Sequence, residues 1–209
     1  MTAASINRLI EGFRGFRKSY YAENRELFDS LAREGQSPKV MIIGCADSRV
    51  DPLLIVGAQP GEVFVVRNVA NLVPPYAPDD RLHGTSAALE FAVLSLRVEH
   101  IVVLGHAQCG GVQALLAGPE GAGKNDFITP WMSIAQPARD KAMTIAAAGH
   151  RQRACEQATV EVSLGNLATF PWIRSRVEAG RLGLHGWYFD LERGALMRFD
   201  AAEKTFLDV

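Results

Sequence analysis

The sequence contains only three cysteines, Cys45, Cys109 and Cys155, and so sparse and odd a set does not suit a disulfide scaffold. In a chain of 209 residues such cysteines are either core fillers or functional thiols. No uninterrupted apolar run is long enough to span a bilayer, so we expect no membrane partner. The formal net charge of −1 gives no reason to expect nucleic acid as a partner.

The N-terminal segment lacks the apolar core and the small-residue cleavage site of a secretory signal. It is Arg-rich and amphipathic, which also suits organelle targeting, but it contains Glu11, Glu23 and Glu26. We therefore interpret it as a surface helix and expect a cytoplasmic protein. Apolar residues recur at helical spacing over 5–33 and predict an arm over 1–34 that buries one face. The residues of this apolar face are Ile6, Leu9, Ile10, Phe13 and Phe16.

Hydrophobic residues make up 48% of the chain and charged residues 22%, which suits one domain over 1–209 with a full core. Short apolar runs at 39–44, 62–66 and 100–105 predict buried strands, and the pattern at 84–96 predicts a helix between the last two. Strands that alternate with helices indicate βαβ units. We therefore predict an α/β fold with a central, mainly parallel β-sheet flanked by helices.

The second half of the chain has a different pattern. Residues 109–180 read as mostly helical, interrupted by a polar, glycine-containing surface loop at 118–126. The runs at 182–189 and 195–199 predict a closing pair of C-terminal strands, with a glycine-containing turn at 192–194.

Chemically active residues lie at the predicted carboxyl ends of strands, where open α/β sheets place ligand sites. Cys45 follows the first strand, and the stretch GHAQCGG places His106 and Cys109 after the third. The His-x-x-Cys spacing lets both side chains reach one ion, although alone it is equally compatible with two side chains lodged in a tight turn. If the first and third strands are adjacent, two thiolates and one imidazole converge, which suits zinc with an open fourth position for water. Cys155 lies in a helical run, and we favour an inert thiol there over a fourth ligand.

Asp47 and Arg49 lie two and four residues after Cys45. One interpretation is an ion pair that stabilises a turn. The other is catalytic: a carboxylate beside the zinc-bound water accepts its hydrogen bond, and the arginine keeps that carboxylate ionised. Asp47 could also swing onto the zinc and close the open position.

Four stretches, CADSRVDP, RNVANLVPPY, GTSAALEFAV and GHAQCGGV, together resemble the signatures of the β-class carbonic anhydrases. The resemblance runs from about residue 35 to the HGWYF segment near the end. It implies zinc-dependent, reversible hydration of carbon dioxide to bicarbonate and a proton by a zinc-bound hydroxide. It also implies one Zn²⁺ per subunit, with Cys45, His106 and Cys109 as the ligands.

The resemblance further implies a catalytic pair and a substrate pocket. Asp47 and Arg49 match the catalytic pair, and Gln36 matches a glutamine that in one subgroup reaches the substrate across a dimer interface. The family assembles at least as a dimer, with the N-terminal arm on a neighbouring subunit, so we expect a homodimer or a dimer of dimers. The remaining substrate-binding candidates are Phe64, Val69 and Gly110.

Some positions depart from the family pattern. A non-catalytic bicarbonate site of some bacterial members needs a tryptophan, an arginine and a tyrosine, and only Arg67 matches here. Ile42 and Phe189 occupy the other two positions, so we expect that inhibitory site to be absent or weak. The glutamine and the PPY stretch at 74–76 favour the plant-like subgroup, whereas Phe91 replaces a tyrosine that lines its pocket.

Two other functions stay open. Relatives with this ligand set hydrolyse carbon disulfide or carbonyl sulfide, and a zinc-stabilised scaffold without activity is a further possibility. The presence of both Asp47 and Arg49 counts against the scaffold. No histidine can be assigned as the proton shuttle among His83, His100, His150 and His185.

Overall fold

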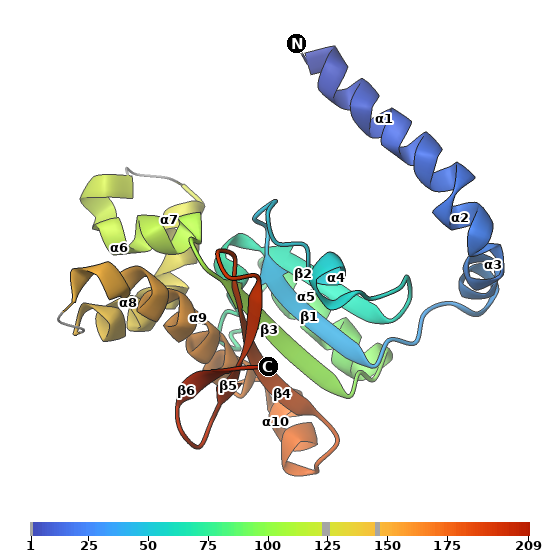
Figure 1. The fold of residues 1–209 in the computed structure, drawn as a ribbon. Helices are drawn as coiled ribbons and strands as arrows, with labels where there is room; N and C mark the ends of the chain where they lie inside the picture. Colours follow the sequence, from blue (N-terminus) through green and yellow to red (C-terminus); the bar gives the residue numbers. More distant parts are fainter. Residues whose placement is uncertain (1, 123–125, 145–146) are drawn as a thin grey trace. The chain divides into compact units, whose positions relative to one another are not determined.

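The computed structural model describes residues 2–122, 126–144 and 147–209 (Figure 1). The chain divides into two compact units, Met1–Ser37 and Pro38–Val209. None of the helices in these described ranges is long and apolar enough to cross a membrane.

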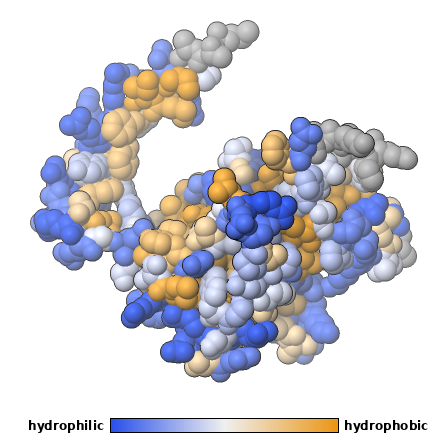
Figure 2. All heavy atoms as spheres, turned by 180° about the vertical axis from the view of Figure 1, so that it is seen from behind, coloured by the Kyte–Doolittle hydropathy of each residue, from blue (hydrophilic) through white to orange (hydrophobic). Residues whose placement is uncertain are grey.

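The N-terminal unit consists of helices in series, α1 (Thr2–Lys18), α2 (Tyr20–Glu23) and α3 (Arg25–Glu34). Gly35 ends α3 with a φ of 80°, a left-handed conformation that glycine adopts without strain. The apolar face predicted for this arm is exposed in the single chain; Leu9 is 63% exposed and Phe13 is 59% exposed. Figure 2 shows apolar side chains gathered along this unit.

The second unit is built on a six-stranded sheet, counted over the described residues, in the order β2-β1-β3-β4-β5-β6. The first four strands run parallel, whereas β5 and β6 are antiparallel to their neighbours. This confirms the predicted fold class, and β6 extends the predicted C-terminal strand pair. The strands are β1 (Val40–Cys45), β2 (Val63–Asn68), β3 (His100–His106), β4 (Gly183–Asp190), β5 (Ala195–Asp200) and β6 (Thr205–Asp208).

The central strands β1 and β3 are buried along nearly their whole length, as expected for strands covered on both faces. They are hydrogen-bonded neighbours, with Gly44 opposite Leu104, so their carboxyl ends meet at one edge. The condition on which the predicted convergence of the three ligands depended, that the first and third strands are adjacent, is therefore met. Cys45 and His106 are the last residues of their strands rather than the first residues beyond them.

Helices connect and cover the strands. Helix α9 lies against β3 and β4, with α8 beside it (Figure 1). The bounds of these helices are α4 (Pro52–Val56), α5 (Gly84–Glu90), α6 (Gly110–Ala122), α7 (Ile128–Met132), α8 (Gln136–Met143), α9 (Arg151–Leu167) and α10 (Pro171–Glu178).

Two predicted segments differ in the structure. The helix expected at 84–96 changes after α5 into a π-helical turn, η2 (Phe91–Ser95). The loop expected at 118–126 is partly helical, because α6 continues to Ala122 after a kink at Gly118, whose φ is 76°. Residues 123–125 of that predicted loop lie outside the described residues.

Candidate metal centre

Two neighbouring strand ends bring the three predicted ligands together. Cys45 ends β1, His106 ends β3, and Cys109 immediately precedes α6. One ligand atom from each side chain lies within 4.8 Å of the others, and all three residues are buried. The alternative in which the His-x-x-Cys pair only fills a turn does not explain why Cys45 joins it from another strand.

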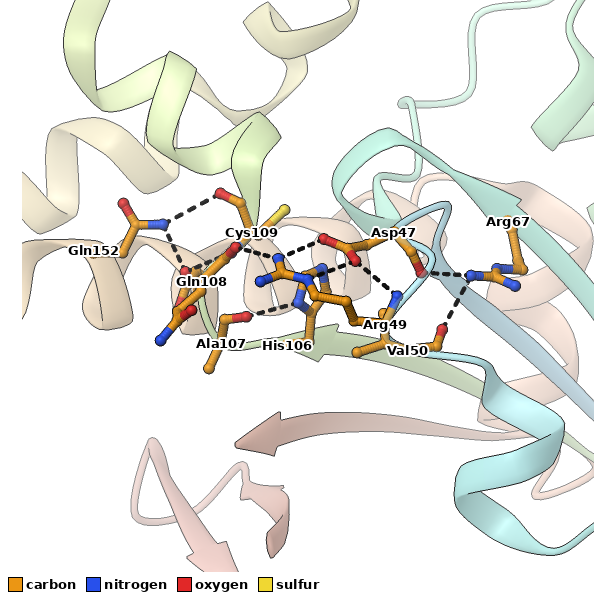
Figure 3. A network of polar contacts seen from close by, with 10 residues as sticks. Asp47, Arg49, Val50, Arg67, His106, Ala107, Gln108, Cys109 and Gln152 are labelled. Atoms are coloured by element: carbon orange, nitrogen blue, oxygen red, sulfur yellow. Dashed lines mark hydrogen bonds and ion pairs between the residues drawn. The ribbon is translucent and has the colours of Figure 1, made fainter. Parts of the chain in front are cut away.

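The imidazole of His106 has a defined orientation (Figure 3). Its Nδ1 atom lies 2.8 Å from the carbonyl oxygen of Ala107, which can only accept, so Nδ1 carries the proton. The Nε2 atom is then an acceptor, and it is buried without a hydrogen-bond partner among the described residues. A histidine whose outer nitrogen is fixed by a carbonyl and whose other lone pair is unused fits a metal ligand.

The two thiols complete a donor set that suits zinc. A hydrogen bond from Cys109 holds the pKa of Cys45 well below its usual range, and sharing this proton raises the pKa of Cys109. Backbone N–H groups of Gly111 and Val112, at the start of α6, point at the Cys109 sulfur and favour its thiolate. A divalent cation would displace the shared proton, and two thiolates with one neutral imidazole match the preferences of zinc.

Cys155 is separate from this cluster. It is fully buried on α9 and is not part of the group of candidate ligands. Burial raises the pKa of its thiol to about 12. These surroundings agree with an inert core thiol.

Asp47 and Arg49 form a two-pronged pair beside the ligands. Asp47 Oδ1 accepts from the backbone N–H and the Nε of Arg49, both at 2.9 Å, and its Oδ2 accepts from Nη2 at 2.7 Å. These bonds hold the pKa of Asp47 well below its usual range. Arg49 Nη2 also donates to the carbonyl of Gln108 at 2.9 Å. The pair therefore does more than stabilise its own turn, because it ties the loop that follows Cys45 to the loop between His106 and Cys109.

Arg67 holds the other side of the Cys45 loop, a role that the sequence analysis missed. Its Nε donates to the Cys45 carbonyl at 2.9 Å, and its Nη2 donates to the Asp47 carbonyl at 2.7 Å. Nη1 contacts Asp51 at 3.0 Å. No signal in the sequence indicated this role, because Arg67 directly follows the run at 62–66 that predicted a strand. Its place opposite Gly44 of β1 comes from the register of the sheet. The donors of Arg67 are engaged by this loop, and the absence or weakness of the inhibitory bicarbonate site stays a prediction.

Val69 lies beside α6, the helix that follows the predicted ligand Cys109, and lines a cavity of about 840 Å³. Its carbonyl accepts a hydrogen bond from Trp131 Nε1 at 2.8 Å, another contact that the sequence did not predict. A Cβ on Gly111 would lie only 2.8 Å from Val69 Cγ1, so glycine is needed for this close approach.

The other predicted pocket residues are dispersed over three elements. Phe64 lies on β2 and packs against Phe91, with ring centroids 5.9 Å apart. Gly110 is the first residue of α6, immediately after Cys109. Gln36 belongs to the N-terminal unit and is exposed there. The roles of these residues toward a substrate stay predictions.

Comparison with known proteins now gives the family. The carbonic anhydrase family model matches residues 40–196, which is most of the chain. The chain belongs to the carbonic anhydrase family. It is 42% identical over 181 residues to beta carbonic anhydrase 5, chloroplastic, of Arabidopsis thaliana. The match covers 85% of this chain but 59% of that relative, so the chain spans about three fifths of the relative's length.

Solved structures place the chain in the β class. The β-carbonic anhydrase CcaA superposes with a TM-score of 0.92 at 33% identity, over 99% of this chain and 92% of that one. A structure described among two tetrameric β-carbonic anhydrases from Sordaria macrospora gives a TM-score of 0.81 at 30% identity, over 95% of this chain and 98% of that one. Similarity over nearly the whole chain confirms the predicted family and its fold.

Proposed function

We propose that this β-class carbonic anhydrase catalyses the reversible hydration of carbon dioxide to bicarbonate and a proton, with one zinc ion per subunit. Cys45, His106 and Cys109 would hold that ion. The observation that carries the proposal is the buried Nε2 of His106, which has no hydrogen-bond partner in the part of the chain that the structure describes and lies next to two buried thiols. Family membership agrees with this assignment.

Zinc in such a site supplies Lewis-acid chemistry, which makes water a nucleophile near neutral pH. Asp47 orients that water: its pKa lies well below the usual range, so its carboxylate accepts a hydrogen bond from water across the neutral pH range. Arg49 occupies both carboxylate oxygens from one side and so fixes the direction in which Asp47 faces.

The substrate is small and uncharged, and apolar walls suit it. Val69 is partly exposed beside α6, and Phe64 is half-buried against Phe91. Both side chains therefore offer apolar surface to a substrate. The backbone N–H of Gly110 is placed by sequence directly after Cys109, where it could donate to a bicarbonate oxygen. Gln36 would come from a neighbouring subunit.

We also infer that the chain assembles at least as a homodimer through its N-terminal unit. The apolar face of α1 includes Leu9 and Phe13, both more than half exposed, and the Sordaria macrospora relatives are described as tetrameric. Sedimentation velocity of the full chain tests this, with a Leu9→Glu and Phe13→Glu double variant as the comparison. The double variant should sediment as a smaller species, and a wild-type monomer would reject the inference.

We also propose a cytoplasmic location. The N-terminal segment contains the acidic residues Glu11, Glu23 and Glu26, whereas organelle-targeting segments are poor in acidic residues.

The decisive experiment is stopped-flow carbon dioxide hydration by zinc-loaded protein between about pH 6.5 and 9, beside a chelator-treated sample. We expect hydration that rises with pH and disappears with the metal, as for a nucleophile made by ionising water. No hydration at any pH, with one zinc bound per chain, would reject the proposal. Hydrolysis of carbonyl sulfide or carbon disulfide by the same sample would then identify the alternative enzyme, and its absence would favour a scaffold.

A further inference from the structure

The buried carboxylate of Glu156 on α9 contacts the ligand loop, by which we mean the segment from His106 to Cys109. Glu156 is only 2% exposed, and its Oε1 accepts the backbone N–H of Cys109 at 2.9 Å. Gln152, one turn earlier, donates from Nε2 to the same oxygen at 2.6 Å. It also donates to the Cys109 carbonyl at 3.2 Å (Figure 3). Both backbone polar groups of Cys109 are therefore bound by side chains of a helix that begins more than forty residues later in the chain.

Close docking of α9 on the sheet brings Glu156 to this position. A Cβ on Gly105 of β3 would lie 2.6 Å from Val160 Cγ2, and one on Gly186 of β4 would lie 2.9 Å from Val160 Cγ1. These two glycines thus let the helix approach the strands closely. Residues four apart share a helix face, so Gln152, Glu156 and Val160 form one line that follows β3 toward the ligand loop.

Tyr188 on β4 fixes the second oxygen of Glu156. Its hydroxyl donates to Oε2 at 2.7 Å, and the ring is completely buried opposite Gly105 in the sheet register. Burial, followed by the neighbouring Glu156 charge, raises the pKa of Tyr188, so the hydroxyl stays protonated and acts as a donor. The Arg153 guanidinium lies 5.2 Å from the ring centroid and binds Asp190 at 2.7 Å. Both oxygens of the Glu156 carboxylate are therefore hydrogen-bonded, Oε1 to Cys109 and Gln152 and Oε2 to Tyr188.

The turn that Glu156 supports is conformationally unfavourable. Gln108, between the ligands His106 and Cys109, has a φ of 56°, a left-handed conformation that costs free energy in a non-glycine residue. Such a conformation persists where the surroundings hold it. The carbonyl of Gln108 is bound by Arg49, and the next N–H is bound by Glu156.

We propose that Glu156 is a positioning residue of the metal centre, which holds the Cys109 backbone so that the thiolate faces the ion before the ion binds. The inference rests on the proposed zinc-dependent function. Glu156 acts through Cys109. A carboxylate suits this role because its two oxygens accept three donors at once, from Cys109, Gln152 and Tyr188.

The test compares zinc affinity, by chelator competition, in the wild type, Glu156→Ala and Glu156→Gln. Absorption of the Co²⁺-substituted proteins reports thiolate coordination, and thermal unfolding of the metal-free proteins reports stability. We expect Glu156→Ala to bind zinc about 10- to 100-fold more weakly, with an altered Co²⁺ spectrum. Glu156→Gln should recover much of the affinity because an amide oxygen still accepts from Cys109.

Ser163→Ala is the matched control. Ser163 is also fully buried on α9, but it bridges the Asn71 carbonyl and the Val73 N–H instead of the ligand loop. This variant should lose stability and keep the wild-type zinc affinity. An unchanged affinity and spectrum in Glu156→Ala, or an equal loss of affinity in Ser163→Ala, would overturn the proposal.

A further variant covers the case in which Glu156→Ala does not fold. Tyr188→Phe retains the carboxylate but removes the donor to Oε2, and we expect a smaller loss of zinc affinity in the same direction. Wild-type affinity in a folded Tyr188→Phe protein would then reject the inference. Because zinc binding is measured without turnover, failure of the wild type to hydrate carbon dioxide would reject the proposed function and leave this inference standing.

Discussion

Arg49 Nη2 donates a hydrogen bond to the backbone carbonyl of Gln108 at 2.9 Å. The same guanidinium binds both carboxylate oxygens of Asp47. One side chain thus orients the predicted catalytic carboxylate and joins the loop that follows Cys45 to the loop between His106 and Cys109. Changes at Arg49 should therefore affect both turnover and metal binding.

Arg49→Lys separates the charge of this residue from its geometry. Lysine keeps the positive charge but cannot make the two-pronged contact with Asp47 while also reaching Gln108. We expect zinc affinity and kcat/KM each to fall by about 10- to 100-fold, the range typical of groups that orient metal ligands. Chelator competition and stopped-flow hydration measure the two effects. Wild-type values in both would show that charge alone is needed.

Asp47→Asn tests the orientation of the water. The amide keeps the shape of the side chain but loses the negative charge, so it is a poorer acceptor for the attacking water. We expect kcat/KM to fall by about 10²-fold or more, while the zinc content stays at one per chain because Asp47 is outside the ligand cluster.

Asp51→Asn is the matched control for that variant. Asp51 lies in the same loop and caps α4 by accepting the N–H groups of Leu53 and Leu54 on Oδ1, which asparagine also does. Its other contact, from Oδ2 to Arg67 Nη1, loses its charge, but Arg67 keeps its hydrogen bonds to the carbonyls of Cys45 and Asp47. The activity of this variant should stay near that of the wild type. An equal loss of activity in Asp51→Asn and Asp47→Asn would mean that loop structure, not water orientation, explains the effect.

The sequence predicted the sheet well because its signals are local. The apolar runs that become β1 and β3 are short and bounded, and parallel neighbours place their carboxyl ends at one edge, which brought Cys45 and His106 together. The kink at Gly118 could not be predicted from such local signals, because a glycine in a polar stretch is compatible with a loop and with an interrupted helix equally well.

The supports of the site were not predictable in the same way. Arg67 reaches the Cys45 carbonyl across 22 residues, and Glu156 reaches the Cys109 N–H across 47. In both contacts the partner is a backbone atom, which every residue type carries. The residue at that position therefore gives no indication of the contact in the sequence. The Glu156 contact also depends on how closely α9 docks, which is set by Gly105 and Gly186 on two different strands.

Gly105→Ala should therefore disturb the fold and the site together. A Cβ there would meet Val160 Cγ2 at 2.6 Å, so α9 must shift away from β3. We expect a loss of about 1–3 kcal/mol in the free energy of unfolding, as for other overpacked cores, and weaker zinc binding because Glu156 moves with the helix. Denaturant unfolding and chelator competition measure the two changes.

Gly165→Ala, on α9 itself, should give the contrasting result. Gly165 is exposed, and a Cβ there would meet nothing within 4 Å. Alanine should stabilise the protein by about 0.5–1 kcal/mol through its higher helix propensity, without changing zinc affinity. Similar effects of the two substitutions would contradict close docking at Gly105.

Thiol labelling tests whether Cys155 is inert. With a pKa of about 12, its thiol is ionised to about one part in 10⁴ at pH 8, and it is also fully buried. The raised pKa means that the thiolate fraction increases as the pH rises yet stays small up to about pH 10.

We expect a thiol reagent to modify Cys155 only on unfolding, whereas Cys45, with its lowered pKa, reacts once a chelator has removed the metal. Mass spectrometry of the labelled peptides identifies the sites. Labelling of Cys155 in the folded protein would contradict its description as an inert core thiol, whereas loss of zinc from a folded Cys155→Ala variant would show that this cysteine takes part in the metal centre.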